Sequence, residues 1–265
     1  MNVCFSGGGI KGYAYIGVLR YFEQKNIAIG SIAGSSIGAL MAFLITLGYN
    51  SRELEHLVLN LDLSLLEDIE IKELFSEYGI NKGLNIRTLI RFLLHHKGFS
   101  KNITFKELHS KTQRRLVISA CNIADYSQKI FDYIQTPDIQ VHKALKASMN
   151  IPFIWKPEII DDKMYIDGCF SSNLPLEVFP VENTIGFYLH TDKQRSTPIA
   201  IQDYTKKLIT CLLSRNNSLE IEKYVSKGYK LIPVETYHVS AMSFQISEDE
   251  IKILINSGIE ACSKL

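Results

Sequence analysis

The stretch Ile32-Ala33-Gly34-Ser35-Ser36-Ile37-Gly38-Ala39-Leu40 follows the pattern Gly-x-Ser-x-Gly, with an apolar run before it and an apolar helical run after it. This pattern predicts a sharp turn from a strand into a helix. Ser36 takes a strained backbone conformation there, and Gly34 and Gly38 leave room for the reversal. Such a turn holds the Ser36 hydroxyl clear of its own backbone, at the positive end of the following helix. The stretch therefore predicts a site for a serine nucleophile.

The first part of the chain alternates predicted strands and helices. Residues 3–5 and 27–33 form apolar runs typical of buried strands, and residues 10–24 and 37–47 show the spacing of helices. This β-α-β-α order predicts an α/β fold with a parallel sheet covered on both faces. In such a sheet, the loop after the first strand and the turn after the second emerge at the same edge.

Further elements follow along the chain, and no repeat or linker divides them, so we expect one domain over residues 1–265. Capping pairs predict helix starts at Asn50 with Glu53, Thr104 with Glu107, and Ser247 with Glu250. We expect strands at 115–120, 127–133, 184–189 and 231–235, a hairpin at 158–166, and helices at 85–96, 137–147 and 203–227, the last broken at Asn216-Asn217.

A glycine-rich loop, Ser6-Gly7-Gly8-Gly9-Ile10-Lys11-Gly12, follows the first predicted strand. Its glycines fit the dinucleotide-binding pattern Gly-x-Gly-x-x-Gly, but that pattern also expects an acidic residue at the end of the second strand, where this chain has none. A phosphate-binding Walker loop does not fit the position of Lys11. Backbone amides of Gly8 and Gly9 at a helix N-terminus are instead suited to stabilising an oxyanion. This interpretation explains the loop and the Ser36 turn together.

A serine nucleophile needs a base, and two candidates lie at predicted strand ends. His190 is the one histidine whose position suits a Ser-His-acid triad. Asp167, followed by Gly168, is presented from a tight turn, and a partly desolvated carboxylate within hydrogen-bond reach takes a serine proton directly. Spacing alone does not choose between the two.

Composition limits the classes of function. Hydrophobic residues at 46% and charged residues at 22% are ordinary for a globular protein. The formal net charge of +1 provides no field that would favour nucleic acid. The five cysteines are scattered without a Cys-x-x-Cys pair, which indicates reduced thiols in an intracellular compartment and argues against a structural zinc site. We also expect no calcium site and no cofactor.

Targeting signals are sparse. The chain opens directly into a predicted strand, so we expect no signal peptide, and its longest apolar stretch is too short to span a bilayer. We therefore expect a cytoplasmic protein or one that associates peripherally with a membrane. The last three residues, Ser263-Lys264-Leu265, match a peroxisomal import tripeptide, although a frayed helix end also explains them.

Several motifs occur in one order along almost the whole chain: the glycine-rich loop, Gly34-Ser35-Ser36-Ile37-Gly38, and Asp167-Gly168. Two further segments are Ala147-Ser148-Met149-Asn150-Ile151-Pro152 and Asn173-x-Pro175, and the chain closes with a segment from Ser243-Phe244 to Gly258. Together they resemble the patatin-like phospholipases. One departure is Cys169, which stands where that family usually has glycine or alanine.

The resemblance implies a three-layer α/β/α fold with a mostly parallel sheet and a Ser-Asp dyad without a catalytic histidine. It implies that Ser36 is the nucleophile, Asp167 the base and the Gly7-Gly8-Gly9 loop the oxyanion hole, with Gly12, Gly34, Gly38 and Gly168 supporting the motifs. The implied substrate is a phospholipid or another acyl-ester lipid at a membrane or lipid surface. Neutral-lipid or small-ester hydrolysis, and an inactive nucleotide-binding or scaffold protein on the same fold, are the alternatives. The apolar run at 151–155 is interpreted as core, with an acyl pocket or membrane contact as its alternative.

Overall fold

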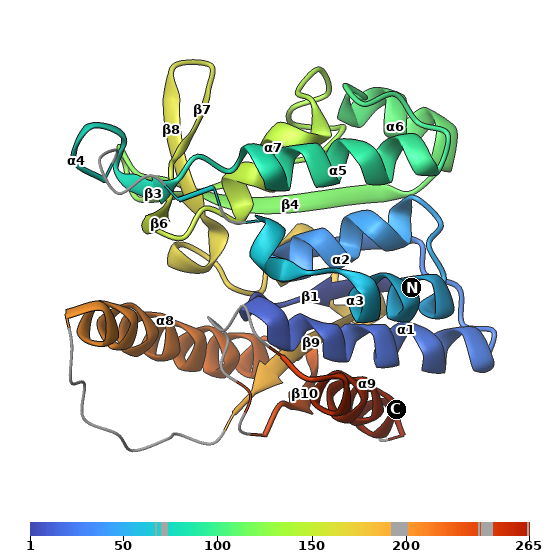
Figure 1. Cartoon of the computed structure of the whole chain (residues 1–265). Coiled ribbons are helices and arrows are strands. Elements are labelled where there is room, and N and C mark those ends of the chain that lie inside the picture. The colour runs from blue at the N-terminus through green and yellow to red at the C-terminus, as the bar shows by residue number, and fades with distance from the viewer. Residues whose placement is uncertain (67, 70–73, 192–200, 238, 240–245, 264) are drawn as a thin grey trace.

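The computed structural model describes residues 1–66, 68, 69, 74–191, 201–237, 239, 246–263 and 265. The strands of its main sheet are β1 (Asn2–Phe5), β2 (Ser31–Ser35), β4 (Arg115–Asn122), β5 (Ser127–Phe131), β7 (Glu158–Ile160), β8 (Lys163–Asp167), β9 (Thr184–His190) and β10 (Lys230–Glu235). Neighbouring strands follow the order β10-β9-β1-β2-β4-β8-β7, and β5 pairs with β4 (Figure 1). A separate pair joins β3 (Gly79–Asn81) to β6 (Phe153–Trp155).

The sheet is parallel from β10 through to β4, and β5, β7 and β8 add antiparallel pairings. Its central strands are buried on both faces, as expected of parallel strands with layers on either side. Side chains alternate along β1: Val3 and Phe5 enter one core, while Cys4 enters a second core on the opposite face. The prediction of an α/β fold with a mostly parallel sheet is confirmed.

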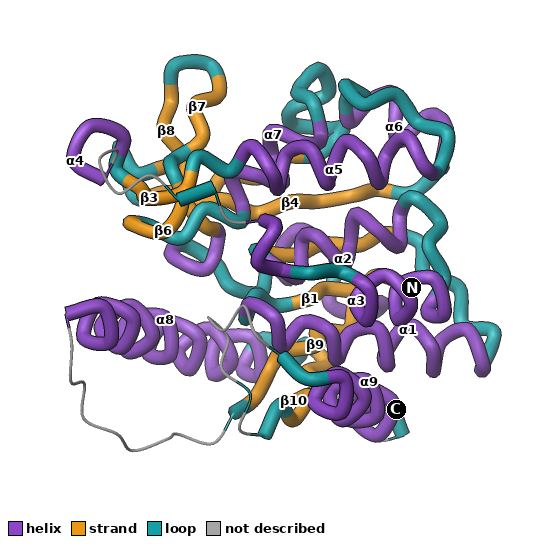
Figure 2. Tube along the Cα trace, in the orientation of Figure 1, coloured by secondary structure: helices purple, strands orange, loops and turns teal. Residues whose placement is uncertain are grey.

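Helices cover the larger core, and Figure 2 shows how they lie beside the strands. The helices are α1 (Ala14–Gln24), α2 (Ile37–Thr46), α3 (Ser51–Asn60), α4 (Leu74–Glu77), α5 (Leu84–His96), α6 (Phe105–Thr112), α7 (Val141–Ser148), α8 (Ile201–Ser226) and α9 (Glu248–Cys262). Short 3-10 helices include η1 (Gly9–Tyr13), η2 (Leu63–Leu66), η4 (Gly168–Phe170), η5 (Leu176–Val178) and η6 (Val181–Asn183). The second core is closed by η5 and by Tyr224 of α8.

Strand β4 brings two distant parts of the chain end to end. Its partner β5 occupies one edge from Ile118 to Asn122. On the other edge, β2 pairs as far as Ser119, and β8, which runs in the opposite direction, pairs from Ala120 onward. The C-terminal ends of β2 and β8 therefore meet beside the middle of β4. The fold places whatever follows Ser35 against Asp167, the last residue of β8.

Several elements differ in extent from the sequence-based predictions, and three of these differences follow from contacts in the fold. Strand β2 begins at Ser31 rather than residue 27, because its neighbours begin opposite Ser31, at Asn2 and Arg115. Helix α7 begins at Val141 rather than 137, because the carbonyl groups of residues 137 and 139 accept hydrogen bonds from the first turn of α6. Helix α8 continues through Asn216-Asn217 without a break.

The three predicted capping boxes are present, at Asn50, Thr104 and Ser247. Within the part of the chain that the structure describes, no helix is long and apolar enough to traverse a bilayer. Four residues of predicted motifs, Ser243, Phe244, Gln245 and Lys264, lie outside the described residues.

Candidate active site

Ser36 lies at the turn between β2 and α2, with φ 53° and ψ −125°. A residue with a side chain adopts such a backbone at a cost of about 1–3 kcal/mol, so the surrounding structure must hold it there. The two glycines of the motif make the turn possible by close approach. A Cβ on Gly34 would lie 2.3 Å from the carbonyl carbon of Gly38, and a Cβ on Gly38 would lie 2.3 Å from the carbonyl oxygen of Phe5. The helix therefore packs directly onto the backbone of the sheet.

Ser36 and Asp167 are hydrogen-bonded to each other. The Ser36 Oγ donates to Oδ2 of Asp167 over 2.6 Å. The other carboxylate oxygen, Oδ1, accepts the amide hydrogen of Cys169 at 2.9 Å, which fixes the plane of the carboxyl group. Asp167 is 2% exposed, and this burial raises its pKa above the ordinary value, against the lowering effect of the two hydrogen bonds. A buried carboxylate with a raised pKa is a stronger base toward the serine hydroxyl.

Ser148, the last residue of α7, holds the Ser36 turn in place through two hydrogen bonds. Its Oγ accepts the Ser36 amide hydrogen at 2.9 Å and donates to the carbonyl oxygen of Ser119 in β4 at 2.6 Å. The backbone of Asp167 is held in a related way, because its amide donates to the carbonyl oxygen of Asn150, just beyond α7. Ser148 and Asn150 belong to a motif seen in the sequence, but neither role is predictable there, since neither contact is visible without the fold.

The glycine-rich loop lies against Ser36. A Cβ built on Gly7 would lie 3.0 Å from the Cβ of Ser36, so the loop backbone touches the serine side chain. The Gly7 amide donates to Oδ1 of Asn173 at 2.9 Å. Gly8 has φ 156° and Gly9 has φ 59°, and their amides open η1, where a helix has no acceptors of its own for its first N–H groups. Of the three predicted glycines, Gly8 and Gly9 present amides at a helix N-terminus, and Gly7 is engaged with Asn173.

Asn173 connects this loop to α8. Its backbone amide donates to Glu220, and its side-chain amide donates to Asn217 at 3.0 Å. The side chain of Asn217 is therefore bonded to Asn173 and does not compete for the backbone of its own helix. This explains why the Asn216-Asn217 pair does not interrupt α8. Asn173 was predicted only as part of a motif, and its contact with Gly7 is a product of the fold.

The turn after Asp167 is packed as tightly as the turn at Ser36. A Cβ on Gly168 would lie 2.3 Å from the carbonyl oxygen of Ser119 and 2.4 Å from the Oγ of Ser35. The Cys169 thiol donates to Oδ1 of Asn173, and its burial raises the pKa of the thiol well above the ordinary value. Cys169 is therefore a buried, protonated thiol that packs beside the loop. Gly12 contributes in the same manner, since a Cβ there would meet the side chain of Ile37.

Among the described residues, His190 makes no hydrogen bond to Ser36 or Asp167. His190 is exposed at the end of β9, and among the described residues no histidine is hydrogen-bonded to Ser36. His238 lies outside the described residues. The side chain to which the Ser36 hydroxyl donates is the carboxylate of Asp167.

An apolar cavity of about 160 Å³ opens beside Ser36. Ser36 and Gly9 form part of its wall, and α2, α3, α5 and the 151–155 segment supply apolar side chains to the rest. From that segment, Ile151, Ile154 and Trp155 line the cavity, whereas Phe153 is 57% exposed. The segment thus combines its two interpretations, because Trp155 belongs to the hydrophobic core and all three side chains also line the cavity. The arrangement combines a serine, a buried carboxylate, helix-terminal amides and an apolar cavity.

Comparisons with known proteins agree with these motifs. The sequence model of patatin-like phospholipases matches residues 3–180. The probable lipid hydrolase 463L of Invertebrate iridescent virus 6 is 33% identical over 67% of this chain and 62% of its own length. Protein R571 of Acanthamoeba polyphaga mimivirus is 26% identical over 98% of this chain and 91% of its own length. The crystal structure of VipD from Legionella pneumophila superposes with a TM-score of 0.68 at 13% identity, over 99% of this chain and 66% of that chain.

The family match spans both Ser36 and Asp167 and covers more than half of the chain, and the VipD likeness extends the same fold over the remainder. The chain belongs to the patatin-like phospholipase family, whose members include lipid hydrolases.

Proposed function

We propose that this protein is a lipid acyl hydrolase of the phospholipase A type that uses Ser36 and Asp167 as a catalytic dyad. The observation that carries the proposal is the 2.6 Å hydrogen bond from Ser36 to a buried carboxylate, at the wall of an apolar cavity. A serine hydroxyl is a weak nucleophile without such a base.

In the first half of the reaction, Asp167 accepts the Ser36 proton while Oγ attacks the ester carbonyl carbon. The carbonyl oxygen becomes an oxyanion, to which the amides of Gly8 and Gly9 donate; removal of one such donor typically costs about 10²–10³ in kcat. The tetrahedral intermediate then collapses. The leaving alkoxide takes the proton from Asp167, which leaves an acyl-Ser36 ester and a released alcohol.

In the second half, Asp167 accepts a proton from a water molecule, and the resulting hydroxide attacks the acyl-Ser36 carbonyl. Collapse returns a proton to Ser36 Oγ and releases the fatty acid. In this scheme Gly7 has a supporting role, because its amide is bonded to Asn173 and holds the loop in place. The dyad needs neither a metal nor a histidine.

The substrate's acyl chain would occupy the apolar cavity beside Ser36. Burial of each methylene stabilises binding by about 0.8 kcal/mol, which favours long chains over short ones. The cavity does not distinguish a phospholipid from a neutral lipid, because both carry the same kind of acyl chain. Hydrolysis of neutral lipids is therefore the second candidate function, with the same residues in the same roles, and small esters would be the poorer substrates.

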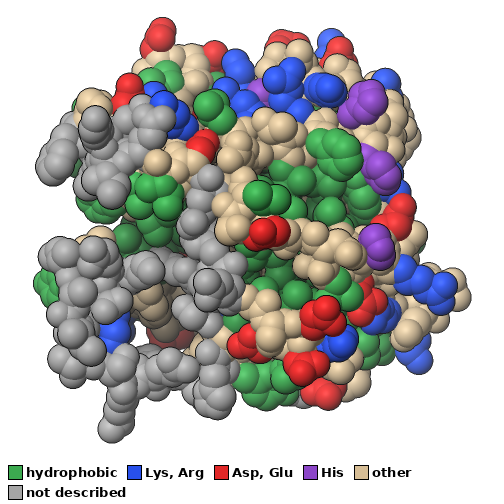
Figure 3. Space-filling model, viewed as in Figure 1, with side chains coloured by type: hydrophobic (Ala, Val, Ile, Leu, Met, Phe, Trp, Pro, Cys, Tyr) green, Lys and Arg blue, Asp and Glu red, His purple; other side chains and the backbone are tan. Residues whose placement is uncertain are grey.

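We also propose that the protein works at a lipid surface. Leu65 of η2 and Leu84 and Phe92 of α5 are each more than half exposed, and η2 and α5 also supply walls of the cavity. Figure 3 shows apolar side chains gathered on this face, between α5 and α1. Exposed apolar residues around a lipid-binding cavity are typical of a membrane interaction site. On vesicles, Phe92→Asp should lower turnover, while Ile123→Asp, an exposed residue beyond β4, should not.

The decisive experiment is labelling with a fluorophosphonate, which forms a covalent bond with an activated serine. The wild-type protein should be labelled at Ser36, and Ser36→Ala should be neither labelled nor active on phospholipid. His190→Ala should keep full activity. Hydrolysis that survives in Ser36→Ala would refute the dyad, and loss of activity in His190→Ala would favour a triad. A wild-type protein that is neither labelled nor active would favour an inactive binding or scaffold protein.

A further inference from the structure

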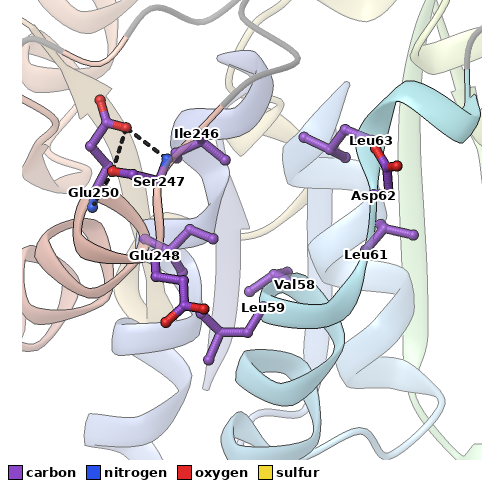
Figure 4. Close-up of a pocket in the computed structure, with 10 residues that line it drawn as sticks. Val58, Leu59, Leu61, Asp62, Leu63, Ile246, Ser247, Glu248 and Glu250 are labelled. Atoms are coloured by element: carbon purple, nitrogen blue, oxygen red, sulfur yellow. Dashed lines mark hydrogen bonds between the residues drawn. The ribbon is translucent and has the colours of Figure 1, made fainter.

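A second depression lies on the surface near the cavity. This groove, of about 530 Å³, runs between the end of α3 with the start of η2 on one side and the start of α9 on the other. Figure 4 shows Leu61 and Leu63 on one wall and Ile246 and Glu248 on the facing one. The groove is open to solvent, and its floor reaches the buried Ile251 of α9.

The groove and the cavity beside Ser36 share part of their walls. Val58, Leu61 and Leu63 line both of them. Helix α3 ends at Asn60, and the backbone becomes extended at Leu61, so the partition consists of one last helical turn and a short extended segment. All three shared side chains are apolar and only partly buried. No polar or charged side chain is among the three residues of this common wall.

We propose that the cavity continues past Val58, Leu61 and Leu63 into the groove, so that the ω end of a long acyl chain leaves the protein between α3 and α9. This inference rests on the proposed function, because it starts from an acyl group bound at Ser36. It assigns the α3–α9 groove as the distal part of an open-ended chain-binding site. The substrate class is then a lipid with a long acyl chain rather than a small ester.

The charge of the groove sets the direction of the chain. The acidic residues Asp62, Glu248 and Glu250 line the groove. The Glu250 carboxylate is hydrogen-bonded to Ser247, whereas Asp62 and Glu248 are exposed beside the apolar side chains. These carboxylates repel an anionic head group or a free fatty-acid carboxylate, so the ester carbonyl belongs at the Ser36 end and the methyl terminus at the groove. Phospholipid therefore enters from the Ser36 side.

An open-ended site has a distinctive chain-length dependence. Each methylene that enters the closed cavity should raise kcat/KM by about fourfold. Once the chain reaches the groove, further methylenes stay partly solvated, and the gain should level off without a fall. A closed pocket would instead reject chains longer than itself.

The direct test uses alkyl fluorophosphonates of increasing length, each with a photoreactive diazirine on the ω carbon. After reaction with Ser36 and illumination, mass spectrometry locates the second attachment point. We expect short probes to attach to residues of the cavity alone, such as Ile90 or Leu93, and long probes to attach within 58–63 or 246–251. Long probes that attach only elsewhere would overturn the inference while leaving the dyad intact. A failure to label Ser36 at all would instead refute the proposed function, and the inference with it.

A substitution provides an independent measurement. Leu61→Trp should narrow the connection between the cavity and the groove. The ratio of kcat/KM for a hexadecanoyl ester over a butanoyl ester should then fall by at least tenfold. Ile253→Trp is the matched control, because Ile253 lies on α9, is 48% exposed and lines neither the cavity nor the groove. An unchanged ratio in a folded Leu61→Trp protein would contradict the proposal that the cavity continues into the groove. If this variant does not fold, the photoreactive probes still test the proposal in the wild-type protein.

Discussion

The amide of Ser36 and the hydroxyl of Ser148 are 2.9 Å apart, and through Ser148 the strained turn is bonded to the carbonyl oxygen of Ser119. One small side chain therefore connects the end of α7, the Ser36 turn and the middle of β4. All three serines are buried, so water does not replace the contact.

Ser148→Ala should lower both stability and activity. It leaves the buried Ser36 amide and the Ser119 carbonyl without this partner, at a cost of about 1–3 kcal/mol. A small displacement of Ser36 should also reduce kcat by about tenfold or more, with less effect on KM. Chemical denaturation and steady-state kinetics measure the two effects. Ser218→Ala, an exposed serine of α8, is the control that should change neither.

Substitutions of Ser36 itself should separate backbone strain from chemistry. Both Ser36→Ala and Ser36→Gly should abolish turnover, because neither retains the hydroxyl. Glycine tolerates the backbone at φ 53°, whereas alanine does not. After the larger unfolded-state entropy of glycine is counted, we expect Ser36→Gly to be about 1 kcal/mol more stable than Ser36→Ala. Equal unfolding free energies would show that the turn holds no strain.

Asp167→Asn should lower activity and raise stability. The asparagine Oδ1 can still accept the Cys169 amide hydrogen, and its Nδ2 can donate to Ser36, so the geometry is kept. Loss of the base should lower kcat by about 10²–10⁴. Removal of a buried carboxylate whose pKa is raised should increase the melting temperature at neutral pH. A variant of unchanged activity would contradict the role of Asp167 as the base.

The raised pKa of Asp167 also predicts the acid side of the activity profile. Catalysis needs the ionised carboxylate, so kcat/KM should fall as pH drops through the folded-state pKa, which burial places above the ordinary aspartate range. In the opposite sense, ionisation of Asp167 weakens folding as pH rises through the same interval. A pH–rate profile on a soluble ester checks the first effect. An acid limb within or below the ordinary aspartate range would contradict it.

His142 of α7 predicts a separate loss of stability in acid. Burial, with the nearby charges of Arg87 and Arg91, lowers the pKa of His142 to about 4, and its Nδ1 has no hydrogen-bond partner among the described residues. The unfolded chain takes up this proton near pH 6.5 and the folded protein only near 4, so stability should fall between these values, by at most about 3 kcal/mol. Denaturation curves of wild type and His142→Leu should diverge over this interval and run parallel above it.

The sequence identified the two residues whose side chains meet, because each stands in a short motif at a strand end. It did not predict how they meet. That depends on β4, whose length allows β2 and β8 to share one edge, and strand length in a buried sheet is set by its neighbours rather than by local pattern. Ser148 and Asn173 were recognised only as members of sequence motifs. Their hydrogen bonds could not be predicted, because the partners lie far away in the sequence. The predicted break at Asn216-Asn217 was wrong for a similar reason. Asn217 accepts a hydrogen bond from the distant Asn173, and the pair remains helical.

The strand order has a consequence for synthesis and for the minimum length of an active chain. Ser36 and Asp167 have both been synthesised by residue 167. Strand β9 joins the far edge of β1 only afterwards, and α8 contacts Asn173, which holds the glycine-rich loop, later still. A nascent chain that ends near residue 180 therefore contains every proposed catalytic group while β1 presents an unpaired edge, a surface prone to aggregation. Strands β9 and β10 complete the sheet beyond β1. We therefore expect a chain truncated near residue 180 to be inactive, although it contains Ser36 and Asp167.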